Sequence, residues 1–104
     1  MLDSISAREI SVSGLRAQRV RMNVIANNIA NAESTRTPEG GPFRRQMAIF
    51  EGEQLRRGSN PERLGVRVSK IMTDPAPSRV VFEPSHPDAN ADGYVSFPNV
   101  SVSV

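Results

Sequence analysis

The chain has 104 residues, of which 38% are hydrophobic and 5% aromatic, so it can form one modest domain or a small domain with an arm. Its formal net charge is only +2, and its arginines are scattered, which does not favour nucleic acid or anionic membrane as a partner. The absence of cysteine excludes a disulfide framework, a thiolate metal site and a cysteine nucleophile.

An amphipathic pattern from about Ser4 to Ala32 predicts a long N-terminal helix. Its apolar residues are three, four or seven positions apart and therefore share one narrow helical face. This stripe consists of Ile5, Val12, Leu15, Met22, Ile25 or Ala26, and Ile29. A long stripe cannot pack against itself, so we expect the helix to need partners. A membrane-surface helix is a weaker interpretation, because the stripe has no Trp or Phe and the helix no Lys.

Four asparagines lie in the second half of this helix, although asparagine favours caps and turns over helix interiors. They are Asn23, Asn27, Asn28 and Asn31. One interpretation is that their amides bond to a neighbouring helix. The other is a solvated, fraying helix end, and composition alone leaves both open.

The segment Thr37–Pro42 ends the helical pattern, and Pro38, Gly40, Gly41 and Pro42 predict an ordered turn or hinge. The two glycines do not predict a phosphate site, because no GK[ST], preceding strand or following helix accompanies them. Phe43–Phe50 then alternates as a strand does, and the polar stretch Glu51–Arg63 is expected to be a loop.

From Leu64 onward, short β-type runs alternate with turn residues. Prolines keep the runs short or at sheet edges, which favours a small antiparallel sheet or partial barrel. The runs are centred on Val66, Val68 and Met72; on Val80, Val81 and Phe82; on Tyr94, Val95 and Phe97; and on Val100, Val102 and Val104. The predicted fold class is therefore α+β, with an arm over residues 1–37, a turn, strand and loop over 38–63, and a β domain over 64–104.

Two motifs in the β part have some features of chemical sites. His86 is the single histidine, but its flanking prolines favour a surface turn over a catalytic triad. Asp88–Gly93 matches the opening of an EF-hand loop, yet Asn99 stands where the bidentate glutamate belongs, and no helices flank the loop. An Asx turn explains the same residues. We predict no catalytic residue, cofactor or metal, and keep a small calcium- or ligand-binding β module as the alternative function.

Two longer motifs resemble a known family. Ser13–Gln18 (SGLRAQ) and Met22–Ala32 (MNVIANNIANA) are similar to the N-terminal motif of bacterial flagellar axial proteins. The continuation Thr35–Gln46 (TRTPEGGPFRRQ) narrows the resemblance to the proximal rod protein of the basal body, the FlgC family. His86–Val100 (HPDANADGYVSFPNV) is similar to the second signature of that family.

The resemblance implies a structural subunit without catalysis that polymerises in the flagellar rod with copies of itself and other rod proteins. It also implies passage through the flagellar type III export apparatus, which agrees with the absence of a signal-peptide pattern after Met1. The stripe and the four asparagines would then form subunit contacts. Family members continue into a C-terminal helix, and that helix is expected to be absent from this chain.

Overall fold

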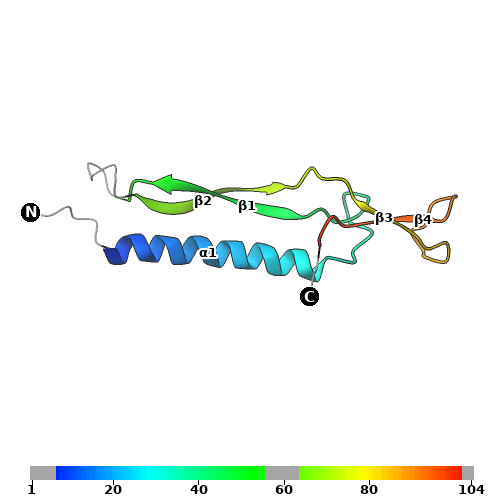
Figure 1. The fold of residues 1–104 in the computed structure, drawn as a ribbon, viewed down its shortest axis with the longest axis horizontal. Helices are drawn as coiled ribbons and strands as arrows, with labels where there is room; N and C mark the ends of the chain where they lie inside the picture. The colour runs from blue at the N-terminus through cyan, green and yellow to red at the C-terminus, as the bar shows by residue number, and fades with distance from the viewer. Residues whose placement is uncertain (1–6, 56–63, 102–104) are drawn as a thin grey trace, which may run out of the picture. The chain divides into compact units, whose positions relative to one another are not determined.

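The computed structural model describes residues 7–55 and 64–101. It contains the helix α1 (Ala7–Ala30) and the strands β1 (Gln46–Glu53), β2 (Gly65–Thr73), β3 (Arg79–Phe82) and β4 (Tyr94–Phe97) (Figure 1). The α+β class predicted from the sequence is confirmed, and α1 is the one α-helix within the described ranges. Ile5 of the predicted stripe lies outside them. Within the same ranges, no helix has the length and apolar content that crossing a membrane requires.

Residue contacts group the chain into two units, each built from two separate stretches of sequence. The first unit joins Met1–Val24 with Ala48–Met72, and the second joins Ile25–Met47 with Thr73–Val104. The regions expected from the sequence, 1–37, 38–63 and 64–104, follow the chain in order and stay a prediction. α1 and β1 each contribute residues to both units.

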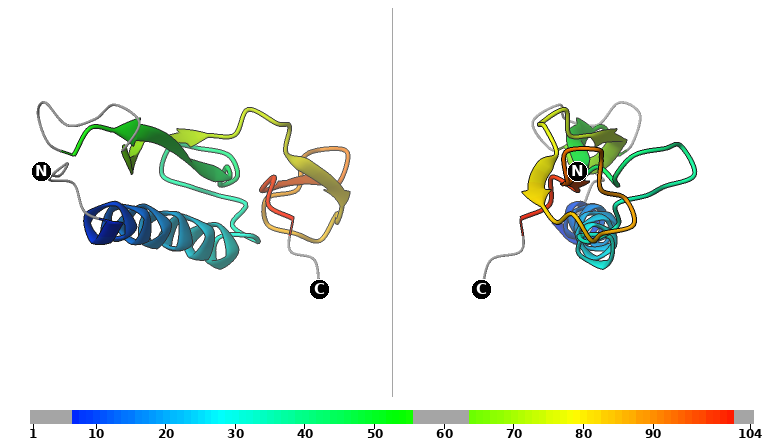
Figure 2. Two further views of the ribbon diagram at one scale, coloured as in Figure 1. Left: turned by 60° about the vertical axis from the view of Figure 1, so that its left-hand side comes forward. Right: turned by 90° about the vertical axis from the view of Figure 1, so that its right-hand side faces the viewer.

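In the first unit, β1 and β2 run in opposite directions beside α1 (Figures 1 and 2). The Ser69 hydroxyl donates a hydrogen bond to the Ile49 carbonyl across the two strands, at 3.2 Å. Arg67 forms an ion pair with Glu51 on the neighbouring strand. β1 therefore continues to Glu53, three residues beyond the predicted end, because a paired strand and a cross-strand ion pair stabilise residues that look like loop in the sequence.

β1 also begins later than predicted, at Gln46 instead of Phe43. The Phe43 N–H bonds the Ser34 carbonyl, 2.9 Å away. The Arg45 N–H donates to the Asn99 side-chain oxygen at 2.7 Å, so it is not available to a neighbouring strand. The alternating pattern of Phe43–Phe50 could not show that Ser34 and Asn99 bond to the first residues of the predicted strand.

In the second unit, β3 and β4 form an antiparallel pair in which Val81 lies opposite Val95 and Phe82 opposite Tyr94. Val95, Phe97 and Pro98 are buried and form its core. The described strands thus make two two-stranded sheets, where the sequence predicted one sheet after Leu64. The physical reason is the Asp74–Pro77 segment between β2 and β3, whose two prolines cannot donate to a ladder.

The last predicted strand is absent from the part of it that the structure describes. Val100 and Ser101 have no strand conformation. Val102 and Val104 lie outside the described residues.

Candidate assembly surface

An apolar stripe of α1 is exposed to solvent. Leu15, Met22 and Ile29 are 70%, 65% and 54% exposed, although leucine, methionine and isoleucine side chains are normally buried. They are seven residues apart, and Val12, Arg19 and Ala26 occupy the alternate positions of the same seven-residue repeat. Such a repeat is the pattern with which one helix packs along another. Ile25 is also exposed.

A different face of α1 is buried, and hydrophobic spacing did not predict it. At about 3.6 residues per turn this face lies roughly opposite the stripe. Its buried members are Ser13, Ala17, Val24 and Asn28. Two of the four are polar and one is small, so a search for large apolar residues passes over them. Their spacing of four, seven and four residues was the available signal.

Ser13 is the polar contact of this face in the first unit. Its hydroxyl donates to the Ile10 carbonyl at 2.7 Å and accepts the Val66 N–H at 3.1 Å. The neighbouring Gly14 has no Cβ, and a Cβ added there would lie 4.0 Å from a methyl group of Val66. The Ser13 hydroxyl therefore joins β2 to α1, whereas a Cβ at Gly14 would make only an ordinary van der Waals contact.

Asn28 is the polar contact in the second unit, and it is 6% exposed. Its Nδ2 donates to the Gln46 carbonyl at 2.9 Å, and its Oδ1 accepts the Gln46 N–H at 2.9 Å. The side-chain amide thus pairs with the main chain of β1 as a neighbouring strand would. Both ends of this amide are used within the chain, which leaves Asn28 little capacity to contact another helix.

The other three asparagines are exposed or half-buried. The Asn31 Nδ2 donates to the Asn27 carbonyl at 2.9 Å, and the Ser34 hydroxyl donates to the Asn31 Oδ1 at 3.1 Å. These bonds close the last turn of α1, where main-chain carbonyls lack helical partners. Asn23 has no side-chain hydrogen bond within the described part of the chain.

The Thr37–Pro42 segment is an ordered turn within a projecting loop (Figure 2). The Thr37 N–H bonds the Gly41 carbonyl at 3.0 Å, and the Gly40 N–H bonds the Thr37 carbonyl at 2.9 Å. Gly40 and Gly41 have φ angles of 89° and 75°, a region in which side chains with a Cβ are strained. These glycines make the turn possible.

The loop is anchored by Asp88, which lies in the second sequence signature. The Thr35 hydroxyl donates to the Asp88 carboxylate at 2.7 Å, and Arg36 forms an ion pair with it. The hydrogen bond from Thr35, followed by that from Arg36, holds the pKa of Asp88 below its ordinary value. The two signatures, far apart in sequence, therefore meet at one carboxylate.

The rest of the EF-hand-like segment forms a turn. The Asn90 Oδ1 accepts the N–H groups of Asp92 and Tyr94 at 2.9 and 3.0 Å, which is the geometry of an Asx turn. The His86 Nδ1 accepts the Asp88 N–H at 2.9 Å, and its ring packs edge-on against Phe97. Within residues 7–55 and 64–101, no group of three His, Cys, Asp or Glu side chains is placed to hold a metal ion.

A second polar cluster connects the start of β1 with the end of β2. The Arg45 guanidinium lies 2.8 Å from the Asp74 carboxylate, and the Asn99 amide donates to the Ala76 carbonyl at 2.9 Å. The N–H of Ala76, followed by the Arg45 side chain, lowers the pKa of Asp74. This cluster fixes where the chain leaves the β2 strand.

Comparison with known proteins gives consistent matches. The family described as "Flagella basal body rod protein" matches residues 9–36. The FlgC flagellar basal-body rod protein of Yersinia enterocolitica is 46% identical over 95 residues, which cover 91% of this chain and 69% of that protein. That of Bacillus subtilis is 42% identical, with 88% of this chain and 69% of the relative covered. That of Borreliella burgdorferi is 40% identical, with 93% and 73% covered.

The chain belongs to the FlgC family of flagellar basal-body rod proteins. The resemblance found in the two signatures is thereby confirmed. FlgC proteins are structural components of the flagellar basal body, and membership of the family implies a role in motility and assembly with basal-body components.

Proposed function

We propose that the chain is a rod subunit that polymerises through α1, whose exposed stripe packs with helices of other copies and of other rod proteins. The observation that carries the proposal is the exposure of Leu15, Met22 and Ile29 on one side of a helix whose other side is buried within the chain. Burying such side chains contributes about 1.5–3 kcal/mol each. The polymer would transmit torque across the periplasm.

The proposal assigns the interface to the stripe, with the exposed amide of Asn23 next to it. Asn27 and Asn31, which bond each other in the last turn of α1, would contribute only at the end of the interface. Asn28 would support the interface indirectly, because its hydrogen bonds to Gln46 hold the helix against β1. The Pro38–Pro42 turn would set the direction of the chain between the helical arm and the rest of the subunit. Residues 1–37 would lie in the helical core of the rod, residues 64–104 outside it, and 38–63 would connect them. The subunit would reach the rod through the flagellar export apparatus.

A charge on the stripe tests this function. Leu15→Asp or Ile29→Asp should abolish motility, because a carboxylate buried between helices without a partner is strongly unfavourable. The measurement is soft-agar swarming of cells whose only copy of the gene carries the change. The β part should stay folded in both variants, as judged by circular dichroism of the purified chain.

Ile71→Asp is the matched control, because Ile71 lies on β2 and is about as exposed as Ile29. Swarming should continue with this variant. Wild-type swarming with Leu15→Asp and Ile29→Asp would contradict the proposal.

A further inference from the structure

The β3–β4 pair has an exposed apolar face in addition to the buried one. The register places Phe82 opposite Tyr94, so their side chains lie on the same side, and Val80 also points to that side. Phe82 is 60% exposed, and Val80 and Tyr94 are exposed as well. The Phe82 and Tyr94 rings meet edge to face, with centroids 5.2 Å apart. We call Val80, Phe82 and Tyr94 the aromatic face.

Two exposed acidic residues are close in sequence to the aromatic face, at the end of the strand pair that carries the turn. Glu83 directly follows Phe82, and Asp92 precedes Tyr94 by two residues; both are exposed. Within the described residues, neither carboxylate has an ion pair or a side-chain hydrogen bond. Asp88 is already paired with Arg36 and does not add to this charge. Arg79 is the one Arg or Lys from the start of β3 to the end of β4.

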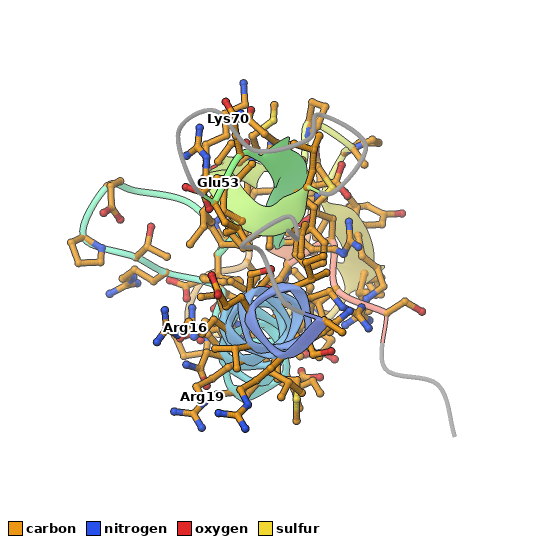
Figure 3. The ribbon with its side chains drawn as sticks, turned by 90° about the vertical axis from the view of Figure 1, so that its left-hand side faces the viewer. Arg16, Arg19, Glu53 and Lys70 are labelled. Carbon is orange, nitrogen blue, oxygen red and sulfur yellow. The ribbon has the colours of Figure 1, made fainter. Side chains whose placement is uncertain are left out.

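α1 carries the complementary charges. Arg16 and Arg19 extend away from the helix (Figure 3), and neither forms an ion pair in the part of the chain that the structure describes. With Val12 and Asn23 they follow steps of four, three and four, so the four residues share one side of the helix next to the stripe. We call Val12, Arg16, Arg19 and Asn23 the arginine flank. A helix packed over Leu15, Met22 and Ile29 borders Val12 and Arg19 and leaves Arg16 and Asn23 open.

Guanidinium groups bind aromatic faces as well as carboxylates. The buried side of the same strand pair already uses this contact, since the Arg79 guanidinium lies 4.9 Å from the centre of the Phe97 ring. Arg16 and Arg19 can therefore satisfy both parts of the β3–β4 surface, the rings through stacking and the acids through ion pairs. Two aromatic faces brought together would instead place their acids against each other.

We propose that the aromatic face of one copy docks on the arginine flank of α1 in a second copy of this chain. The inference rests on the proposed assembly function and adds a head-to-tail contact to the packing of helices. Because the two surfaces differ, the contact does not close on itself in a dimer and can repeat along a filament. Arg16 and Arg19 lie against Phe82 and Tyr94, with Glu83 and Asp92 as their counter-charges.

Disulfide cross-linking tests the contact directly, because the chain has no cysteine of its own. Arg16→Cys and Glu83→Cys chains are purified separately, mixed and oxidised. The mixture should give several-fold more cross-linked dimer than either chain alone. Lys70→Cys, an exposed position on β2, is the control and should give no enrichment with Glu83→Cys. Equal yields from the two mixtures, or dimers formed mainly between Glu83→Cys chains, would overturn the proposal.

Charge reversal separates this contact from the packing of helices. Arg16→Glu with Arg19→Glu should weaken self-association on the order of tenfold, and so should Glu83→Arg with Asp92→Arg. Mixing the two reversed chains should restore it, as measured by sedimentation velocity. Failure of the mixture to recover would overturn the inference. If reversed chains assembled normally while Leu15→Asp still abolished motility, the proposed function would stand and this contact would not.

Discussion

At the residue scale, polar side chains form the contacts that hold α1 within each unit. Asn28 and Ser13 are unfavourable or neutral in a helix interior, yet each satisfies a main-chain group of a strand. Buried main-chain groups must find partners, and a side-chain amide or hydroxyl is the partner here. The sequence showed that asparagine was unusual in this helix but not what it bonds, because the partner, Gln46, is 18 residues away.

Asn28→Ala should lower the free energy of unfolding by about 1–3 kcal/mol, because it leaves the partly buried N–H and C=O of Gln46 without their side-chain partner. Urea denaturation followed by circular dichroism measures the change. Asn23→Ala, an exposed asparagine of the same helix, is the matched control and should stay within about 0.5 kcal/mol of wild type. Equal stability of the two variants would show that the hydrogen bonds between Asn28 and Gln46 do not contribute to the free energy of unfolding.

Asp74 and Asp88 should make the fold sensitive to acid. Their pKa values are lowered in the folded chain, so their contribution is complete above the ordinary carboxyl pKa of about 3.9 and is lost as pH falls through the lower folded values. Thermal unfolding at stepwise lower pH, from about 5 downward, should show decreasing stability. Asp88→Asn should flatten that dependence in part. An unchanged profile in this variant would exclude Asp88 as a contributor.

At the element scale, α1 has two useful faces, and sequence analysis identified only one of them. The stripe of Leu15, Met22 and Ile29 was predicted from hydrophobic spacing, and the structure shows these residues exposed on one side of the helix. The face with Ser13 and Ala17 was missed, because small and polar residues give no hydrophobic signal. Strand ends were misplaced for a related reason: Arg45 and Glu51 acquire their conformation from partners distant in sequence.

The close approach of α1 and β2 should make Gly65 sensitive to substitution. A Cβ at Gly65 would lie 2.7 Å from the Ser13 hydroxyl and 2.7 Å from a Leu55 methyl group. Gly65→Ala should therefore destabilise the chain by about 1–3 kcal/mol. Gly52→Ala in β1 is the control, since its nearest neighbour would be a Leu64 methyl group at 3.2 Å. Thermal melts that rank Gly52→Ala as the more damaging change would contradict this packing.

At the scale of the whole molecule, a chain with this much exposed apolar surface should not stay monomeric at high concentration. Apolar patches larger than those of ordinary monomers mark interaction sites. Family membership, two signatures and the α+β class were all predictable from the sequence. The division into two sheets was not, because the sequence pattern does not show which strands pair with one another.

The purified chain should therefore self-associate as its concentration rises. Sedimentation velocity should show a mean sedimentation coefficient that increases with concentration, and Met22→Asp should reduce that increase by removing apolar contact and adding a charge. Ile71→Asp should leave it largely unchanged. A chain that stays monomeric at all concentrations would count against the stripe as an interface.

The meeting of Thr35, Arg36 and Asp88 has a practical consequence for engineering chimeras between relatives. A loop grafted alone over residues 35–43 would arrive without the carboxylate that the Thr35 hydroxyl and the Arg36 guanidinium contact. Residues 86–94, which include Asp88, should therefore be exchanged together with the loop. Hybrids that exchange both pieces should express as folded chains, whereas those that exchange one should be recovered mainly as proteolysed material.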